Sequence, residues 1–237
     1  MDFERGLALM NEKIEKLEQI IGYTFKDKLL VKRALTHTSF ANEQRINKNG
    51  DYERLEFLGD AVLELLTSEF IYLNHSHMGE GQMTKFRAML VCEPSLALSA
   101  KEINLCEFIL LGKGESATGG RRRDSIVSDV MEALIGALYL DGGMDVAKRF
   151  VHQYILSDVE TKQCIFDAKS SLQELVQKHK AGQISYVLLS EKGPEHSKEF
   201  ECAVEIGGQR MGTGIGKNKK EAEQKAAAEA LSFYKKQ

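Results

Sequence analysis

Acidic residues recur at helical spacing in the segment DYERLEFLGDAVLELL, residues 51–66. On a helix of 3.6 residues per turn they fall within a wedge of about 80°, and apolar residues fill the rest of the circumference. The four acids are Glu53, Glu56, Asp60 and Glu64. Partial burial of such carboxylates raises the free-energy cost of ionising them. The face therefore keeps a proton, pairs with Arg and Lys of a neighbouring helix, or holds cations.

A second apolar segment, SIVSDVMEALIGAL at residues 125–138, carries Asp129 and Glu132 three positions apart on one helical face. Gly136 lies about 20° from Asp129, where a missing side chain permits close approach. If the two helices face each other, their carboxylate pairs converge. Oxygen-only ligands select Mg²⁺ or Mn²⁺, and the lack of His in both segments disfavours zinc or a di-iron site. Carboxylate-held Mg²⁺ suits the hydrolysis of phosphodiesters.

The composition is that of an ordinary globular chain of 237 residues, 43% hydrophobic and 28% charged. No apolar run reaches 18 residues, so no membrane span is expected, and the amino-terminal stretch lacks the apolar core of a signal peptide. The four cysteines are scattered and include no CxxC pair, which favours free thiols in a reducing compartment. We therefore expect a cytoplasmic protein with no membrane partner.

The front two-thirds of the chain has the apolar periodicity of helices. One stripe ends at Gly22, and the pair Gly142 and Gly143 stops a later helix. Strand-like alternation is scarce before residue 180. The segments predicted to be helical are 11–21, 26–37, 51–66, 96–112, 128–141 and 146–160. An all-α domain is therefore expected here.

The rear of the chain changes to an α-β-β-β-α order. Helical segments at 168–179 and 219–234 flank strand-like segments at 184–193, 198–206 and 207–216. The charge changes as well, because residues 1–160 hold 19 basic and 25 acidic side chains, and residues 161–237 hold 13 and 10. These changes predict an all-α domain at 1–160, a short linker at 161–168 and a small α+β domain at 169–237.

Lysines crowd the start of the last helix, in GKNKKEAEQ. Cations there oppose the helix dipole, so the arrangement is either a phosphate site or a solvated lysine cluster. With DAKSSLQELVQ and KGPEHSKEFECAVEI, this segment resembles the double-stranded RNA-binding domain over its whole length. The departures are Ser170, where Thr is usual, and QISY, where Pro often precedes the Tyr. The resemblance implies three groups of RNA contacts: Ser170, Gln173, Glu174 and Gln177; Pro194, Glu195 and His196; Lys217, Lys219 and Lys220.

The segment ERLEFLGDAVL is the signature of the ribonuclease III family, and here it is unbroken. RALTHTSFANE precedes it, and GEGQMTKFRAMLV and GGRRRDSIVSDVMEALIGALYLDGG follow, so nearly the whole chain resembles this family. The resemblance implies a Mg²⁺-dependent endoribonuclease, in which Mn²⁺ can substitute, that cuts double-stranded RNA to 5′-phosphate and 3′-hydroxyl ends. Precursors of ribosomal RNA and structured messenger RNAs are the substrates it implies.

The same resemblance assigns roles to individual residues. It implies that Glu56, Asp60, Asp129 and Glu132 bind metal, and that Asp60 and Glu132 among them are catalytic. It also implies a homodimer in which Phe57 protrudes into a socket of the partner subunit. The residue pattern alone would place Phe57 in the core.

Other residues near these motifs have less specific readings. Glu53 helps at the site or binds the partner subunit, and Glu64 is expected to be structural. His37, in THTSF, is expected to be a hydrogen-bonded core residue. The loop Arg121–Arg123 directly precedes the Asp129 helix, which favours contact with the RNA backbone over a solvated turn.

Two other functions are compatible with parts of the pattern. One is an RNA-binding protein of the same fold that has no catalytic activity. Such a protein should have lost at least one of the four predicted metal-binding carboxylates, but all four are present. A metal-dependent nuclease acting on DNA is disfavoured by the rear domain, because that domain reads 2′-hydroxyls and A-form shape. Cleavage assays on RNA and DNA duplexes separate the three alternatives.

Overall fold

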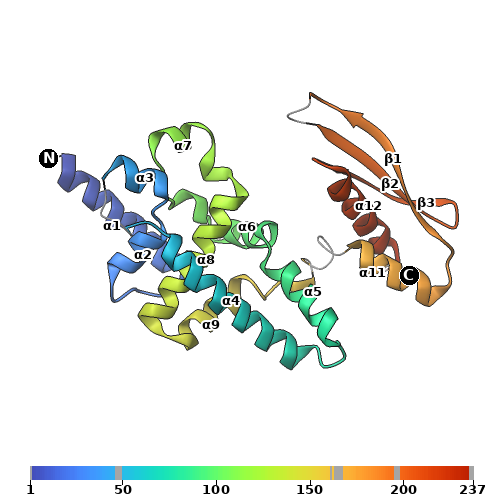
Figure 1. Ribbon diagram of the computed structural model, residues 1–237, viewed down its shortest axis with the longest axis horizontal. Coiled ribbons are helices and arrows are strands. Elements are labelled where there is room, and N and C mark those ends of the chain that lie inside the picture. Colours follow the sequence, from blue (N-terminus) through green and yellow to red (C-terminus); the bar gives the residue numbers. More distant parts are fainter. Residues whose placement is uncertain (1, 46–49, 161, 163–167, 195–197, 235–237) are drawn as a thin grey trace. The chain divides into compact units, whose positions relative to one another are not determined.

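The chain divides into two compact units, Met1–Asp158 and Val159–Gln237. The computed structural model (Figure 1) describes residues 2–45, 50–160, 162, 168–194 and 198–234, with side chains described from residue 10 to residue 233. Most of the linker predicted at 161–168 lies outside the described residues.

The first unit is built from helices, as predicted. Two are 3₁₀ turns (η), and the others are α-helices. Within the described ranges, no helix is both long and apolar enough to cross a membrane. The elements are α1 (Asp2–Ile21), α2 (Lys28–Ala34), α3 (Thr38–Glu43), α4 (Glu53–Asn74), α5 (Glu80–Val91), α6 (Glu93–Glu102), η1 (Leu105–Glu107), α7 (Lys113–Ala117), η2 (Gly120–Arg122), α8 (Asp124–Gly142) and α9 (Met144–Tyr154).

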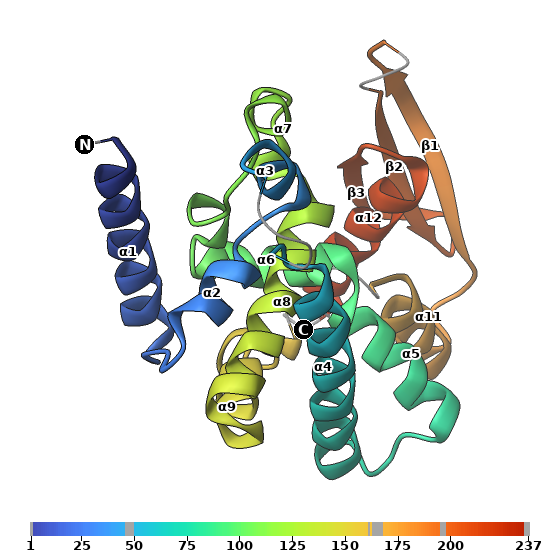
Figure 2. The same ribbon diagram turned by 60° about the vertical axis from the view of Figure 1, so that its left-hand side comes forward.

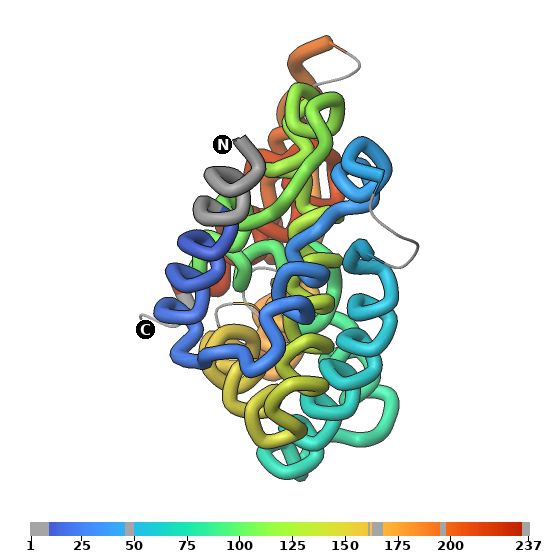
Figure 3. Tube along the Cα trace, turned by 90° about the vertical axis from the view of Figure 1, so that its left-hand side faces the viewer, coloured from blue at the N-terminus to red at the C-terminus, as the bar shows by residue number. Residues whose placement is uncertain are grey.

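Helix α8 forms the centre of this unit. It is apolar nearly all round, and every residue from Ala133 to Leu138 is buried, as expected of a helix enclosed by others. Helices α4, α6 and α9 pack against it, and Figure 2 shows α4 beside it. Helix α2, blue in Figure 3, packs on it as well. The half-buried acids of α8 are therefore held on a rigid element.

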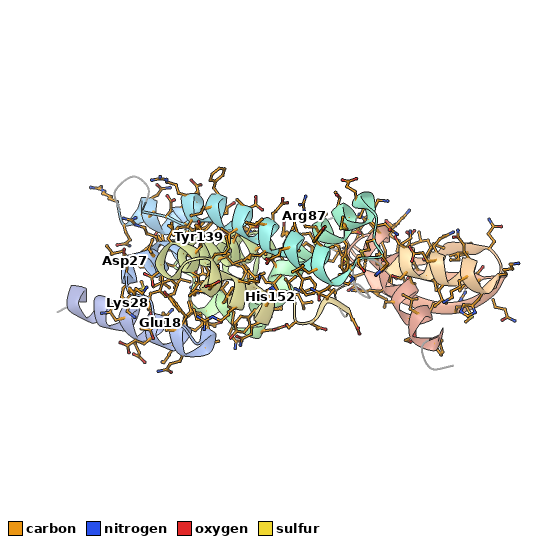
Figure 4. The ribbon with its side chains drawn as sticks, turned by 90° about the horizontal axis from the view of Figure 1, so that it is seen from below. Glu18, Asp27, Lys28, Arg87, Tyr139 and His152 are labelled. Atoms are coloured by element: carbon orange, nitrogen blue, oxygen red, sulfur yellow. The ribbon has the colours of Figure 1, made fainter. Side chains whose placement is uncertain are left out.

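Polar contacts fix the turn between α1 and α2. Glu18 is buried, accepts a hydrogen bond from the backbone N–H of Phe25 (2.8 Å), and pairs with Lys28 (2.5 Å). Asp27 caps α2 by accepting from the backbone N–H of Leu29. Figure 4 shows these side chains at the same end of the unit. The turn begins at Gly22, whose φ of 67° ends α1 where the sequence predicted.

The helix predicted at 96–112 is wrong beyond residue 102. Helix α6 ends at Glu102, and Asn104 takes a left-handed backbone with φ of 50°. Leu110 instead bridges to Thr36, because its N–H donates to Leu35 O (2.8 Å) and its carbonyl accepts from His37 N (3.0 Å). The backbone N–H and carbonyl of Leu110 thus form hydrogen bonds with residues far away in the sequence and not within a helix. Helical periodicity does not reveal such partners.

The second unit has the predicted α-β-β-β-α order. Its elements are α11 (Ala168–His179), β1 (Ile184–Lys192), β2 (Glu199–Ile206), β3 (Gln209–Gly216) and α12 (Lys219–Tyr234). The strands form one antiparallel sheet in the order β1-β2-β3. Leu172 and Val176 of α11 share a core with Val204 and Ile206 of β2 and with the alanines of α12.

Glycines in β3 let α12 lie unusually close to the sheet. A Cβ at Gly212 would lie 2.4 Å from Ala226 O, and a Cβ at Gly214 would lie 2.3 Å from Ala222 O. The sequence indicated only a glycine-interrupted strand, and the reason for the interruption is this backbone approach. The approach fixes the start of α12, where the predicted RNA-binding lysines lie.

Candidate active site

The two acidic helices cross at a pair of glycines. A Cβ added to Gly59 of α4 would lie 1.8 Å from the carbonyl oxygen of Glu132, and one added to Gly136 of α8 would lie 2.3 Å from Leu55 O. Side chains larger than hydrogen therefore do not fit at either position. What approaches Gly136 closely is the backbone of α4, which brings the acids of both helices to one place.

The four predicted metal ligands gather at this crossing. Glu56 and Asp60 come from α4, and Asp129 and Glu132 come from α8. An open pocket of about 380 Å³ is lined by Glu53, Glu56, Phe57, Asp60 and Glu132. Asp129 lies close enough to interact electrostatically with both Glu56 and Glu132.

Burial and mutual repulsion raise the pKa values of this cluster. The pKa of Glu132 rises to about 8, first through burial and then through the charges of Asp60, Glu56 and Asp129. The pKa of Glu56 rises to about 7, through burial and then the charges of Asp129, Glu53 and Asp60. Burial and the neighbouring carboxylates thus dominate at Glu56 and Glu132, and the site favours either protons or an added cation.

The donor set fits a hard divalent cation. All the converging groups are carboxylates, which Mg²⁺ and Mn²⁺ prefer, and Mg²⁺ commonly keeps several waters and takes only one or two protein carboxylates. In the described part of the chain, no three His, Cys, Asp or Glu side chains are close enough together to hold a metal ion as they stand. The arrangement is an open carboxylate rim, with space for a substrate oxygen or water as further ligands.

Sequence reasoning missed Tyr52, the residue that precedes α4. Its hydroxyl donates to Oδ2 of Asp129 (3.1 Å), across 77 residues of chain. Burial raises the pKa of Asp129, while this hydrogen bond and the nearby His37 lower it. His37 caps α3 by accepting from the N–H of Ser39 (3.1 Å), which agrees with the predicted hydrogen bonding. Its side chain is half-buried, so the predicted core position is wrong. The only signal for Tyr52 in the sequence was its place directly before the acidic helix.

The remaining acids of the wedge differ in environment. Glu53 is exposed and lines the pocket, and its charge contributes to the raised pKa of Glu56. Glu64 approaches Arg87 of α5 at 3.7 Å, and the Arg87 guanidinium also donates to Ser68 Oγ at 2.9 Å. Figure 4 labels Arg87 on α5 alongside α4. Glu64 therefore links α4 to α5, which is the structural role expected of it.

The Arg121–Arg123 loop is more structural than its position suggested. The Arg121 guanidinium donates to the carbonyl oxygens of Cys106 (2.7 Å) and Ile109 (2.8 Å). Arg123 pairs with Glu115 at 2.8 Å. Two of its three cations therefore hold the fold together, and Arg122 is exposed. The sequence could not show this, because carbonyl acceptors leave no residue pattern.

Phe57 is 82% exposed, against the core position that its pattern alone suggested. It lies between the carboxylate pocket and a second pocket of about 630 Å³. That second pocket has apolar walls from α2, α4 and α8, rimmed by charged groups. Its lining residues are Leu30, Arg33, Asp51, Glu53, Arg54, Leu55, Phe57, Leu58 and Leu140. An exposed aromatic ring beside an apolar pocket is unusual for a monomer surface.

The predicted RNA contacts lie on exposed parts of the second unit. The α11 residues repeat at helical spacing on the face opposite the buried Leu172 and Val176, and all are exposed. Pro194 is exposed after β1, while Glu195 and His196 lie outside the described residues. The lysines at the start of α12 are exposed too. These exposed residues are Ser170, Gln173, Glu174, Gln177, Pro194, Lys217, Lys219 and Lys220.

Comparison with known proteins matches both units. The family model described as Ribonuclease-III-like matches residues 27–159, and the model described as Double-stranded RNA binding motif matches residues 168–234. Ribonuclease 3 of Geobacillus thermodenitrificans is 50% identical over 221 residues, which cover 92% of this chain and 90% of the relative. Ribonuclease 3 of Geobacillus kaustophilus is 48% identical over 232 residues, covering 97% and 94%.

A solved structure agrees with the first unit. The nuclease domain of ribonuclease III from Campylobacter jejuni is 45% identical, with a TM-score of 0.57, and the match covers 61% of this chain and 97% of that one. That structure is described by the flexibility of a region involved in dimer formation of the nuclease domain.

Proposed function

The chain belongs to the ribonuclease III family, and from that premise we propose that it is an endoribonuclease that hydrolyses phosphodiester bonds in double-stranded RNA. The observation that carries the proposal is the convergence of two carboxylates from α4 and two from α8 at the glycine crossing. A chain that had kept only RNA binding would have no need to hold four mutually repelling acids on a rigid helix pair.

The proposal assigns Mg²⁺ to Glu56, Asp60, Asp129 and Glu132, with Mn²⁺ as a substitute and with Asp60 and Glu132 as the catalytic pair. When bound, the cation supplies positive charge that favours deprotonation of a water and stabilises charge on the leaving oxygen. In hydrolysis, the water oxygen bonds to phosphorus, the bond from phosphorus to O3′ breaks, and O3′ takes a proton. The products are a 5′-phosphate and a 3′-hydroxyl.

The second unit would hold the duplex while the first cuts it. In this arrangement the exposed α11 residues contact one minor groove, and Pro194, Glu195 and His196 contact the next. The lysines that begin α12 contact the phosphates between these grooves. The support is that the described members of all three groups are exposed, while the opposite face of α11 is buried.

The functional molecule in this proposal is a homodimer. The exposed ring of Phe57 would enter the apolar pocket of a second copy, and the symmetric contact would fill the pocket of the first. Burying the exposed Phe57 ring in the apolar pocket removes apolar surface from water, which favours association of the two subunits. The substrates proposed are ribosomal RNA precursors and structured messenger RNAs in the cytoplasm.

A substrate panel tests the proposal. The full chain is incubated with Mg²⁺ and with one sequence prepared as RNA duplex, DNA duplex and single-stranded RNA, with EDTA as the metal control. We expect cleavage of the RNA duplex alone, to 5′-phosphate and 3′-hydroxyl ends, and no cleavage in EDTA. Binding of duplex RNA without cleavage would instead identify an RNA-binding protein, and cleavage of the DNA duplex would identify a general nuclease.

A further inference from the structure

The hydroxyl of Tyr52 makes a long-range contact with the candidate metal site. It donates to Oδ2 of Asp129 at 3.1 Å, and the tyrosine side chain is buried, with 5% of its surface exposed. Among the described residues, no donor other than Tyr52 reaches this carboxylate, so Oδ1 remains available. The bond joins the amino-terminal end of α4 to the middle of α8.

Tyr52 is itself held from several sides. Its N–H donates to the carbonyl of Thr36 (3.0 Å), and its carbonyl accepts from the N–H groups of Leu55 (2.8 Å) and Glu56 (2.9 Å). Its ring centroid lies 5.6 Å from that of His37. Since the backbone and the ring are both fixed, the hydroxyl has little freedom, and it constrains the Asp129 side chain.

We propose that Tyr52 is a positioning residue for metal binding, which holds the Asp129 carboxylate through Oδ2 and leaves Oδ1 free to serve as a ligand. The inference rests on the proposed function, because it assumes that Asp129 is a metal ligand. Partners that orient a ligand in this way typically change metal affinity by about 10–100-fold when they are removed. A single neutral donor to one oxygen belongs at the lower end of that range.

The chain contains a matched control for this bond. The hydroxyl of Tyr23 donates to Oδ2 of Asp141 at 2.7 Å, and Asp141 also lies on α8. Tyr23→Phe and Tyr52→Phe therefore remove the same kind of bond to the same helix. Tyr23 lies outside the carboxylate pocket, so a purely structural role predicts similar behaviour of the two variants.

The test measures binding of Mn²⁺ alone to the full chain, without RNA, from the electron paramagnetic resonance signal of the free ion. Wild type, Tyr52→Phe and Tyr23→Phe are compared, with thermal unfolding in EDTA as the measure of stability. We expect Tyr52→Phe to raise the Kd for Mn²⁺ about tenfold and Tyr23→Phe to leave it unchanged. In an Asp129→Asn background, adding Tyr52→Phe should weaken binding no further.

Each result has a distinct meaning. An unchanged Kd in Tyr52→Phe, with normal binding in wild type, would overturn the positioning role and leave the proposed function intact. Wild-type protein that binds no Mn²⁺ would overturn both. If Tyr52→Phe does not fold, Mg²⁺ titration of wild type with ¹³C-labelled tyrosines decides the question. The Tyr52 ring signal should move with saturation while that of Tyr23 stays still, and a motionless Tyr52 signal would contradict the inference.

Discussion

Glu132 has a pKa raised to about 8. Changing this residue should affect RNA cleavage without affecting RNA binding. Glu132→Gln keeps the shape of the side chain but removes the charge of a proposed metal ligand, while in the proposed function the second unit holds the duplex RNA. We expect cleavage of an RNA hairpin to fall by at least about 100-fold, with the gel-shift Kd nearly unchanged. The control is Glu64→Gln, an acid of α4 that lies outside the carboxylate pocket and contacts Arg87. Near-normal cleavage by Glu132→Gln would remove this residue from the site.

The same residue makes metal-free stability depend on pH. The folded pKa of Glu132 is raised to about 8 from an ordinary value of 4.5, so folding takes up a proton between these values. This contribution is fully present below pH 4.5 and is lost as the pH rises through about 8. Above pH 8 the folded wild-type protein contains an ionised, half-buried Glu132, which lowers its stability. Glu132→Gln has no charge at this position and does not incur that cost.

Thermal unfolding in EDTA checks this expectation. At pH 8.5, Glu132→Gln should be more stable than wild type by about 2 kcal/mol, after allowance for the partial exposure of the group. The advantage should shrink at pH 5.5 and disappear when Mg²⁺ is added, because the cation neutralises the cluster. An advantage that is equal at both pH values would mean that Glu132 is not the titrating group.

At the scale of elements, the crossing of α4 and α8 depends on two glycines. Gly59→Ala places a Cβ where the carbonyl oxygen of Glu132 lies 1.8 Å away, so the helices must separate. We expect a loss of at least about 3 kcal/mol in the free energy of unfolding, together with weaker Mn²⁺ binding. Urea unfolding measures the loss.

Gly81 of α5 provides the matched control, because a Cβ there meets nothing within 4 Å. Gly81→Ala replaces a helical glycine by alanine in open space and should be neutral or stabilising by up to about 1 kcal/mol. Equal behaviour of the two variants would mean that the crossing tolerates separation.

The start of α12 makes the corresponding prediction for RNA binding. Lys219→Ala with Lys220→Ala should weaken duplex binding and lower the slope of log K against log salt by about 0.9 for each lost phosphate contact. Lys225→Ala is the control, since Lys225 pairs with Glu221 at 2.8 Å. Filter binding at several salt concentrations gives the slopes. If the double variant keeps the wild-type slope, these lysines are only a solvated surface.

Periodicity predicted the two helices that carry the site, and it predicted which face of the 51–66 and 125–138 segments carries acids. Helical spacing placed Glu56 and Asp60 on one face of their helix, and Asp129 and Glu132 on one face of theirs. The structure brings both pairs to the same pocket region. Local spacing suffices here because side-chain direction follows directly from helical geometry. The alternating strand β2 was predictable for the same reason.

Contacts between distant segments were not predictable in this way. The Tyr52–Asp129 bond spans 77 residues, and the Leu110 bridge that ends the predicted 96–112 helix pairs with Thr36. Arg121 contacts backbone carbonyls, which every residue possesses. Such partners are chosen by tertiary packing, so a pattern within one segment carries no trace of them.

At the scale of the whole molecule, the described part of each chain supplies one such carboxylate cluster, whereas a double-strand break needs two cuts. A double-strand break therefore requires two chains, with the exposed Phe57 and its neighbouring pocket as the proposed contact. Each cluster would cut one strand, and neither would depend on the other for chemistry.

A mixed dimer tests this central claim most directly. One wild-type subunit and one Glu132→Gln subunit carry different tags and are purified in tandem, then given RNA duplex labelled separately on each strand. Homodimers of each kind, purified in the same way, are the controls. We expect the mixed dimer to nick one strand of each bound duplex and to leave the other intact. Cleavage of both strands of one bound duplex at the wild-type rate would contradict it.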